Sequence, residues 1–296
     1  MAKTRFRSDS GLTARMGAVG LGLGAVYVAF GAFLISQTNL AFGAIIVVGM
    51  AWGQWFFSDK LALKSIGGQL VTPEQAPELH GMIDRLCALA DMPKPRVAVA
   101  VTDMPNAFAT GRSPKHSVVC VTTGIMQRLD ADELEGVLAH ELAHVANRDV
   151  SVMTVASSLG LLAGYLTRFG MYFGGGRGKG GNGPGFLVVL LVSMAVYAIS
   201  FILTRALSRY RELSADRTGA YLTGKPSKLS SALVKISGDM ARIPNRDLRE
   251  AEGLNAFFFA PAINRESLGA LMSTHPTLEQ RLDQLAKVSA DLSEQV

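Results

Sequence analysis

The chain has 296 residues, of which 49% are hydrophobic and 18% are charged, and its formal net charge is +5. These are few charges for a soluble protein, so the hydrophobic residues have to be located before domains are counted. The basic residues gather at the ends of hydrophobic runs, which favours a membrane surface as partner and argues against nucleic acid. Cys87 and Cys120 lack the spacing of a metal site or a redox pair, so we expect buried thiols in a reducing compartment.

The amino-terminal segment predicts a pair of membrane-spanning helices. Residues 1–15 form a basic, polar head, and residues 16–35 and 40–57 are hydrophobic runs, each about long enough to cross a bilayer. The first run is too long for a signal peptide and a second follows at once, so we expect an uncleaved hairpin over 16–57. The second run ends in an aromatic belt and two lysines, namely Trp52, Trp55, Phe56, Phe57, Lys60 and Lys64. Positive charge before the first run and after the second places both ends of the hairpin in the cytoplasm.

Residues 58–149 are predicted to form the first part of a catalytic domain. Thr72-Pro73-Glu74-Gln75 has the pattern of a helix start, and the prolines of Pro93-Lys94-Pro95 end that helix. Val97, Val99 and Val101 alternate as a strand, and a second strand is expected at 118–121. Two strands that lead into a helix predict an α+β core.

The segment between these strands is a candidate substrate-binding edge. Its residues, Asn106-Ala107-Phe108-Ala109-Thr110-Gly111, are small and polar enough to lie exposed. In a protease such an edge can take up the substrate as an added strand. The alternative is a plain turn, and this segment taken alone favours the turn.

The segment His140-Glu141-Leu142-Ala143-His144 has the pattern of a zinc-binding helix. Asp130 and Glu133 have the spacing of a capping box before it. Two histidines four residues apart share a helix face, so both imidazoles can reach one tetrahedral Zn²⁺, with Glu141 placed to act on its water. Glu141 falls inside the hydrophobic stripe, where an isolated carboxylate is costly. That cost favours a catalytic site over a chance match on a surface helix.

Residues 150–204 are predicted to form a second hydrophobic hairpin. The runs 150–173 and 186–204 flank a Gly-rich loop at 174–185, in which Lys179 is followed by Gly and which therefore does not match a phosphate-binding loop. The hairpin returns the chain to the cytoplasmic side and gives about four transmembrane helices in all. Basic residues in its outer loop weigh against this orientation, and partial embedding in the membrane is the alternative.

Residues 205–296 are predicted to complete the catalytic domain. Glu212 and Asp216 are four residues apart and share a helix face. A catalytic zinc takes three protein ligands, and two histidines with one glutamate are a standard set, so Glu212 is the expected third ligand. Asp216 would orient a ligand histidine through its second nitrogen. A charged surface helix is the alternative, and it is favoured only if the zinc motif is ignored.

The last candidates lie near the carboxyl end, where Pro276 is expected to open a helix. His275 and Arg281 are placed to donate hydrogen bonds to the oxyanion of a tetrahedral intermediate. Equally, His275 could cap that helix, and the spacing does not decide between the two roles.

Taken together, these motifs resemble the HtpX-type membrane zinc metalloproteases, relatives of the zinc proteases that process prenylated CAAX proteins. The resemblance covers nearly the whole chain and includes the edge segment, the zinc motif, Glu212-Leu213-Ser214-Ala215-Asp216 and Ser273-Thr274-His275-Pro276. It implies a mainly helical integral membrane protein with a zincin-like (gluzincin) core and one Zn²⁺ per chain. It also implies a cytoplasm-facing site in the bacterial plasma membrane and a substrate-binding strand at Asn106, Ala107, Phe108 and Ala109.

The resemblance implies that unfolded or misassembled membrane proteins are degraded in stress-related quality control. Two other functions fit the same residues. One is a zinc-binding membrane scaffold or chaperone without proteolysis, against which the glutamate at 141 and an open fourth metal position argue. The other is a CAAX-type processing protease, for which four spans are too few. The sequence gives no oligomeric state.

Overall fold

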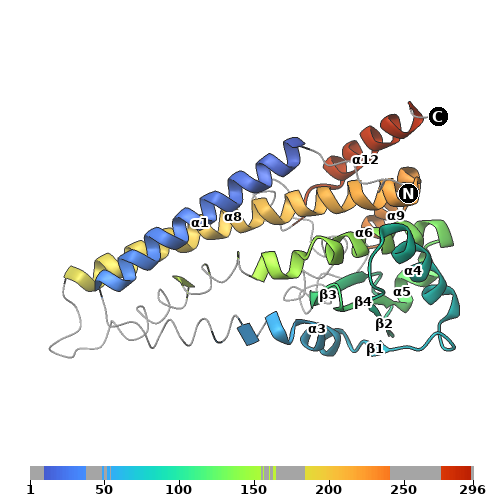
Figure 1. The fold of residues 1–296 in the computed structure, drawn as a ribbon, viewed down its shortest axis with the longest axis horizontal. Coiled ribbons are helices and arrows are strands. Elements are labelled where there is room, and N and C mark those ends of the chain that lie inside the picture. Colours follow the sequence, from blue (N-terminus) through green and yellow to red (C-terminus); the bar gives the residue numbers. More distant parts are fainter. Residues whose placement is uncertain are drawn as a thin grey trace.

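We describe the fold from a computed structural model of the chain, which places residues 10–37, 49, 52–53, 55–154, 156, 160, 163–164, 184–240 and 275–294. The helices among them are α1 (Ser10–Gln37), α3 (Ser58–Ile66), α4 (Pro77–Ala90), α5 (Thr123–Arg128), α6 (Ala131–Ala146), α8 (Pro184–Thr223), α9 (Pro226–Met240) and α12 (Leu278–Ser293). The strands are β1 (Gln69–Leu70), β2 (Arg96–Ala100), β3 (Ala107–Ser113) and β4 (His116–Thr122). Figure 1 shows α1 and α8 packed side by side and running away from a body that holds the sheet.

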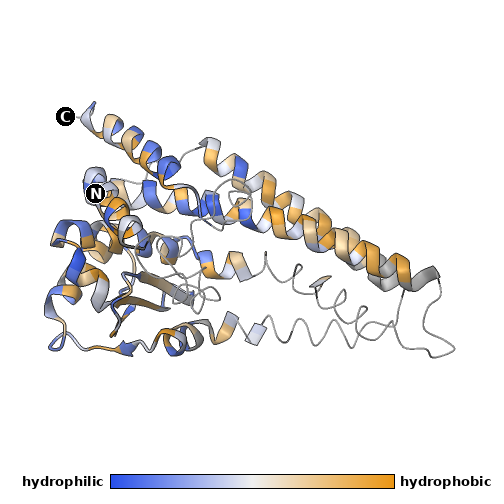
Figure 2. Cartoon of the chain, turned by 180° about the vertical axis from the view of Figure 1, so that it is seen from behind, coloured by the Kyte–Doolittle hydropathy of each residue, from blue (hydrophilic) through white to orange (hydrophobic). Residues whose placement is uncertain are grey.

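The two long helices carry the membrane-spanning character of the described residues. Ser10–Phe30 and Leu190–Thr223 are long and hydrophobic enough to cross a membrane. Figure 2 shows hydrophobic residues all along them beyond the body. Leu21 is 78% exposed and Leu191 is 64% exposed, and such side chains need a lipid environment or a partner.

The structure also bears on the predicted basic head and on the two other predicted spans. Helix α1 begins at Ser10, so part of the expected basic head, 10–15, is helical rather than a separate segment. The expected spans at 40–57 and 150–173, and the Gly-rich loop, lie mostly outside the described residues.

The sheet places β3 at an edge, in the order β1-β2-β4-β3. Strand β2 runs parallel to β4, and β3 runs antiparallel to β4 with Ala109 opposite Val119. Both expected strands are therefore present. The candidate edge segment is a strand rather than a plain turn, and the side chains of Ala107 and Phe108 are buried.

Helix α4 begins later than its sequence pattern predicts. The pattern placed the start at Thr72–Gln75, but residues 72–76 form a turn in which the N–H groups of Gln75 and Ala76 both donate to Thr72 O at 3.1 Å. The helix starts at Pro77, and Ala76 before it has φ −141° and ψ 64°. A residue that precedes proline is disfavoured in helical conformation, which moves the start past the first proline.

Helix α6 is the central element of the body. Its predicted capping box is present, since Glu133 N–H donates to Asp130 Oδ1 at 2.8 Å and Asp130 N–H donates to Glu133 Oε2 at 2.9 Å. The helix packs against β3, α8 and α9. Its side chains join the main hydrophobic core, whose fully buried members include Ile83, Leu86, Val119, Leu138, Leu142, Leu233 and Leu285.

Helix α8 is continuous over 40 residues, from Pro184 to Thr223. The predicted boundary between a membrane hairpin ending at 204 and a catalytic segment beginning at 205 therefore falls inside one helix. A single rigid element joins the hydrophobic span to Glu212.

A glycine allows α8 to approach α6 closely. A Cβ at Gly219 would lie 2.8 Å from His140 N and 3.1 Å from Ala139 C. Both atoms are backbone, so a side chain at 219 could be accommodated only by moving one helix away from the other. The contact lies beside the first histidine of the zinc motif.

We predict that Gly219→Ala lowers the thermal midpoint of the detergent-solubilised protein. Overpacking of this kind costs about 1–3 kcal/mol, which corresponds to roughly 2–4 °C for each kcal/mol in a protein of this size. Gly81→Ala on α4 is the matched control, because a Cβ there meets nothing within 4 Å. Equal midpoints for Gly219→Ala and wild type, followed by circular dichroism, would show that the helix contact is not tight.

Candidate active site

Three side chains from two helices converge at the junction of α6 and α8. The ligand atoms of His140, His144 and Glu212 all lie within 4.8 Å of one another. The two Nε2 atoms are 3.1 Å apart. Glu212 faces both rings, with Oε1 at 3.3 Å from His144 Nε2 and Oε2 at 3.7 Å from His140 Nε2. The structure thus brings the predicted ligand set together.

Each histidine holds a carboxylate at its other nitrogen. His140 Nδ1 lies 2.9 Å from Asp216 Oδ1, as expected from the sequence. His144 Nδ1 lies 2.6 Å from Asp149 Oδ2, a contact that the sequence analysis missed. A carboxylate at Nδ1 keeps the proton there and leaves Nε2 as an acceptor or metal ligand.

Asp149 reaches His144 because the chain turns sharply after α6. Arg148 has φ 57°, in the left-handed region that residues other than glycine rarely adopt. Because of this turn, Asp149 does not continue the helix α6, and its side chain lies on the side of α6 that carries His144. The signal in the sequence is a carboxylate five residues after a ligand histidine, which carries weight only once the turn is known.

Two arginines hold the outer carboxylates. Arg281 donates two hydrogen bonds to Asp216, from Nε at 2.7 Å and from its terminal nitrogen at 2.6 Å. Arg211 forms an ion pair with Asp149. Both guanidinium groups are largely buried, and such bidentate or desolvated pairs fix the carboxylates in place. Arg281 therefore contacts Asp216, which in turn contacts His140.

The site fits a divalent metal ion. With both Nδ1 protons held by carboxylates, the two Nε2 lone pairs and the Glu212 carboxylate face one another, an arrangement that repels without a cation. Burial lowers the pKa of His140, although the hydrogen bond that its Nδ1–H donates to Asp216 partly offsets this, so the imidazole is in the neutral form that binds metals. The pKa of Glu212 lies well below its usual value, so this carboxylate stays ionised where the two Nε2 atoms converge, and it attracts a cation.

Glu141 lies between the ligand helix and the edge strand. Its Oε2 accepts a hydrogen bond from Ala109 N–H on β3 at 2.8 Å. Burial raises the pKa of Glu141 to about 8; the charge of His144 lowers it, and the charge of Glu212 raises it. A carboxyl group that titrates near neutrality can both accept and release a proton.

His275 contacts Glu212 and does not cap the following helix. Its Nδ1 lies 3.1 Å from Glu212 Oε2. The cap of α12 is Thr277, whose side chain accepts from Gln280 N–H at 3.2 Å in a capping box. The capping alternative for His275 is therefore wrong, and Pro276 precedes the cap instead of opening the helix.

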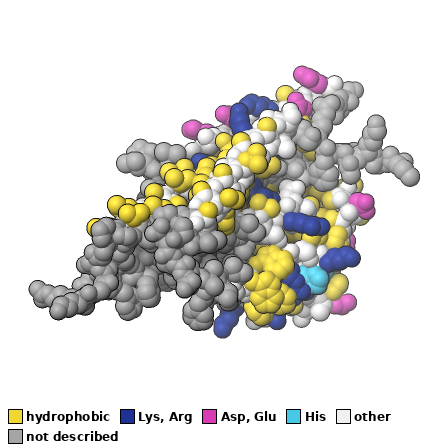
Figure 3. Space-filling view, turned by 60° about the vertical axis from the view of Figure 1, so that its left-hand side comes forward, with side chains coloured by type: hydrophobic (Ala, Val, Ile, Leu, Met, Phe, Trp, Pro, Cys, Tyr) yellow, Lys and Arg dark blue, Asp and Glu magenta, His cyan; other side chains and the backbone are white. Residues whose placement is uncertain are grey.

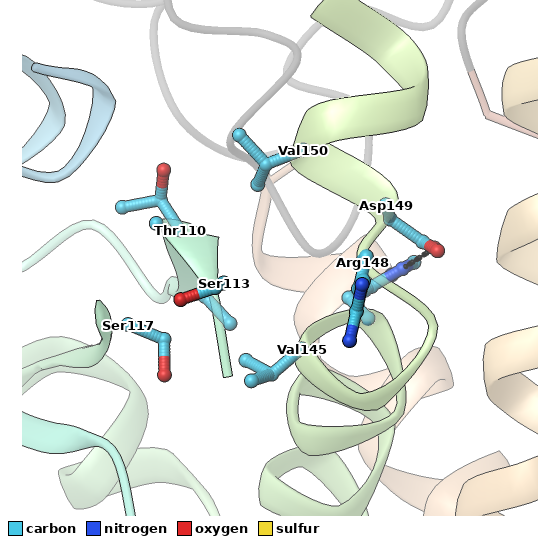
Figure 4. A pocket seen from close by; sticks show the side chains of 10 residues that line it. Thr110, Ser113, Ser117, Val145, Arg148, Asp149 and Val150 are labelled. Atoms are coloured by element: carbon cyan, nitrogen blue, oxygen red, sulfur yellow. Dashed lines mark hydrogen bonds and ion pairs between the residues drawn. The ribbon is translucent and has the colours of Figure 1, made fainter. Parts of the chain in front are cut away.

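A pocket adjoins the histidines at the end of β3. Figure 4 shows it between the edge strand and the turn after α6, lined by Thr110, Ser113, Val145 and Asp149 among others. Asn106 is buried and its N–H donates to Thr122 Oγ1 at 2.9 Å, so it helps to hold the start of β3 against the end of β4. Among the four predicted substrate-binding residues, Ala109 contacts Glu141 through its N–H.

A His-His-Glu cluster with a buried glutamate against a sheet edge defines a metallopeptidase. The family model "Peptidase family M48" matches residues 73–289. The chain belongs to peptidase family M48 and is a membrane metalloprotease of the HtpX type. The family resemblance inferred from the motifs is confirmed.

The relatives named below carry that assignment. Protease HtpX homolog 1 of Streptomyces coelicolor is 55% identical over 99% of this chain and 97% of its own length. Protease HtpX homolog of Moorella thermoacetica is 51% identical over 99% of both chains. Protease HtpX homolog 2 of Methanosarcina acetivorans is 50% identical over 98% of this chain and all of its own. The crystal structure of S. mikatae Ste24p shares the fold, with a TM-score of 0.55 at 17% identity over 94% of this chain and 67% of that chain.

We predict that Asp149→Asn weakens metal binding by about 10–100-fold, the usual loss when the partner of a ligand histidine is removed. The amide keeps the shape but no longer holds the Nδ1 proton as a carboxylate does. Competition with a chromophoric chelator measures the affinity on the purified protein. Asp132→Asn is the matched control, because Asp132 lies half-exposed on α6 and pairs with Lys225 at 2.7 Å. An affinity within twofold of wild type would remove Asp149 from the site.

Proposed function

We propose that this metalloprotease is a zinc endopeptidase that cleaves misfolded or damaged membrane proteins at the cytoplasmic face of the plasma membrane, as part of stress-related quality control. The observation that carries the proposal is the position of Glu141. It lies beside two facing imidazoles and is hydrogen-bonded to the backbone of an edge strand. This arrangement joins a metal site, a proton acceptor and a surface for an extended peptide.

One zinc ion per chain would be held by His140, His144 and Glu212. Two nitrogens and one carboxylate are a donor set typical of catalytic zinc, which keeps one position open. When bound, zinc supplies Lewis acidity toward the scissile carbonyl and the attacking water. Asp149 and Asp216 keep the histidine Nδ1 protons in place, so that both Nε2 atoms stay directed at the ion.

Glu141 is the general base and then the general acid. Its carboxylate takes a proton from the attacking water as the water oxygen bonds to the carbonyl carbon. The same carboxyl group gives that proton to the amine nitrogen as the C–N bond breaks, and the products are a carboxylate and an amine. His275, which lies against Glu212, is the proposed donor to the developing oxyanion, and Arg281 is a positioning residue that acts through Asp216.

The edge of β3 would bind the substrate as an added strand. The side chains of Asn106, Ala107 and Phe108 are buried, so this edge offers the substrate mainly backbone groups. Backbone pairing is tolerant of sequence but requires an extended peptide. That requirement favours unfolded segments over folded proteins.

The membrane arrangement proposed for the chain has four spans around a gluzincin-type core, with both hairpin ends in the cytoplasm. Basic residues before α1 and after the second hydrophobic run support this orientation. The continuity of α8 supports an active site close to the membrane surface, because one helix carries both a span and the third ligand. We also propose a division of the chain into a head at 1–15, hairpins at 16–57 and 150–204, and two catalytic parts at 58–149 and 205–296. In this division, the boundary at 204 lies within the continuous helix α8.

We predict that Glu141→Gln abolishes proteolysis and keeps zinc. Loss of a general base typically costs about 10²–10⁴-fold in rate, whereas none of the three ligands is altered. Zinc content by mass spectrometry and cleavage of casein and of membrane-protein segments are measured on chelated, zinc-reloaded protein. Glu135→Gln is the matched control on the same helix, where Glu135 pairs with Arg85 at 2.6 Å.

The outcomes separate the proposed functions. Zinc in both forms, with cleavage by wild type and the control alone, supports the endopeptidase. Zinc in both forms without cleavage of any substrate by wild type would favour the scaffold function. Cleavage restricted to prenylated peptides would favour a processing protease.

A further inference from the structure

Aromatic and basic side chains gather where the second hydrophobic run meets the body. We call this set the interfacial cluster; its members are Trp52, Phe56, Phe57, Lys60 and Arg112. Trp52 stacks on Phe56 with ring centroids 5.1 Å apart, and Phe56 meets Phe57 edge to face at 5.0 Å. The Arg112 guanidinium lies 4.4 Å above the Phe56 ring and Lys60 Nζ lies 5.8 Å from the Phe57 ring. Two cations therefore sit over two neighbouring rings.

The interfacial cluster is open to its surroundings. Trp52 is 57% exposed and Phe57 is 42% exposed. Figure 3 shows hydrophobic side chains gathered on this face with basic side chains beside them. Among the described residues, neither Arg112 nor Lys60 has a carboxylate partner, and Lys115 in the next turn is also exposed. Exposed aromatic rings with unpaired cations are typical of the boundary between lipid and water.

Hydrogen bonds tie this cluster to the active site. Trp55 Nε1 donates to Ser151 Oγ at 2.9 Å, and Ser151 Oγ donates to Arg112 O at 3.2 Å. Arg112 lies on β3, the strand whose Ala109 N–H donates to Glu141. The carboxyl end of β3 is thus fastened to the segment that enters the membrane and to the chain that follows α6.

We propose that the interfacial cluster binds the phosphate groups of anionic phospholipids and thereby holds the carboxyl end of β3 at the membrane surface. A guanidinium stacked on a ring keeps its N–H edge available for a phosphate oxygen. The rings occupy the level of the headgroups, and Lys60 adds a second charge over the adjacent ring. The partner is an anionic phospholipid of the bilayer in which the protein is embedded.

The two tryptophans of the chain make this proposal directly measurable. Trp52 and Trp55 both lie in or beside the cluster, so intrinsic tryptophan fluorescence reports on this region alone. The full-length protein is reconstituted into phosphatidylcholine bilayers that contain a minor fraction of phosphatidylglycerol, with bromine on the chains of one lipid or the other. The ratio of quenching at equal mole fraction gives the local preference for the anionic lipid.

We expect wild type to be quenched more by brominated phosphatidylglycerol, and Arg112→Gln to lose about fivefold of that preference, since one cation near an anionic surface is worth about 1 kcal/mol. Lys60→Gln should shift the ratio in the same direction. Arg217→Gln is the matched control, because Arg217 also stacks on a ring, that of Tyr221 at 5.1 Å, but lies on α8 away from the cluster. Equal quenching of wild type by both lipids, or an Arg112→Gln ratio equal to that of Arg217→Gln, would overturn the proposal.

A second readout tests the connection to β3, and it alone rests on the proposed proteolysis. Phosphatidylglycerol should lower the KM of wild type for a membrane-anchored substrate and leave the KM of Arg112→Gln unchanged. A wild-type KM that is the same in both bilayers would overturn the connection. An inactive wild type that still prefers the anionic lipid would reject the proposed function, because the quenching requires no catalysis.

Discussion

The close packing of α6 against α8 is the contact on which the site depends. Helix α6 carries both histidines, and α8 carries Glu212 and Asp216, so no metal site exists until the two helices meet. Gly219 permits the approach, since any side chain there would collide with the backbone at His140. The same helix α8 extends through a candidate membrane span, so one continuous helix carries both that span and Glu212.

Charge explains why the inner groups are held so firmly. A buried carboxylate is stable only when it is paired or hydrogen-bonded. Here each outer carboxylate has an arginine and a histidine, as in the series Arg281–Asp216–His140 and Arg211–Asp149–His144. Glu141 instead contacts a backbone N–H and has a raised pKa. The fixed pairs orient the two histidines, whereas Glu141, which forms no ion pair with an arginine among the described residues, is the carboxyl group proposed to move protons.

The proposed metal ligands could be predicted from their spacing along the sequence. Contacts that depend on how the chain turns and packs could not. His140, His144, Glu212 and Asp216 follow from the spacing of four residues on a helix and the need of zinc for a third ligand. Asp149 was not predicted, because its contact with His144 depends on the left-handed turn at Arg148. The start of α4 was predicted too early, because Pro77 disfavours helical conformation at Ala76. The sequence pattern indicates a helix at Glu212 and Asp216 but not that it continues without a break from the hydrophobic run before 204. Nor does it indicate that Ala109 reaches Glu141, because that contact joins segments distant in the sequence.

The central claim is that His140, His144 and Glu212 hold one zinc ion. X-ray absorption at the zinc edge of the full-length protein in detergent tests it most directly. We expect one zinc per chain, bound by two imidazoles and by oxygen ligands at about 2.0–2.2 Å, with no sulfur. A sulfur ligand at about 2.3 Å would instead assign the metal to a cysteine. That result, or a zinc with a number of imidazoles other than two, would contradict the account.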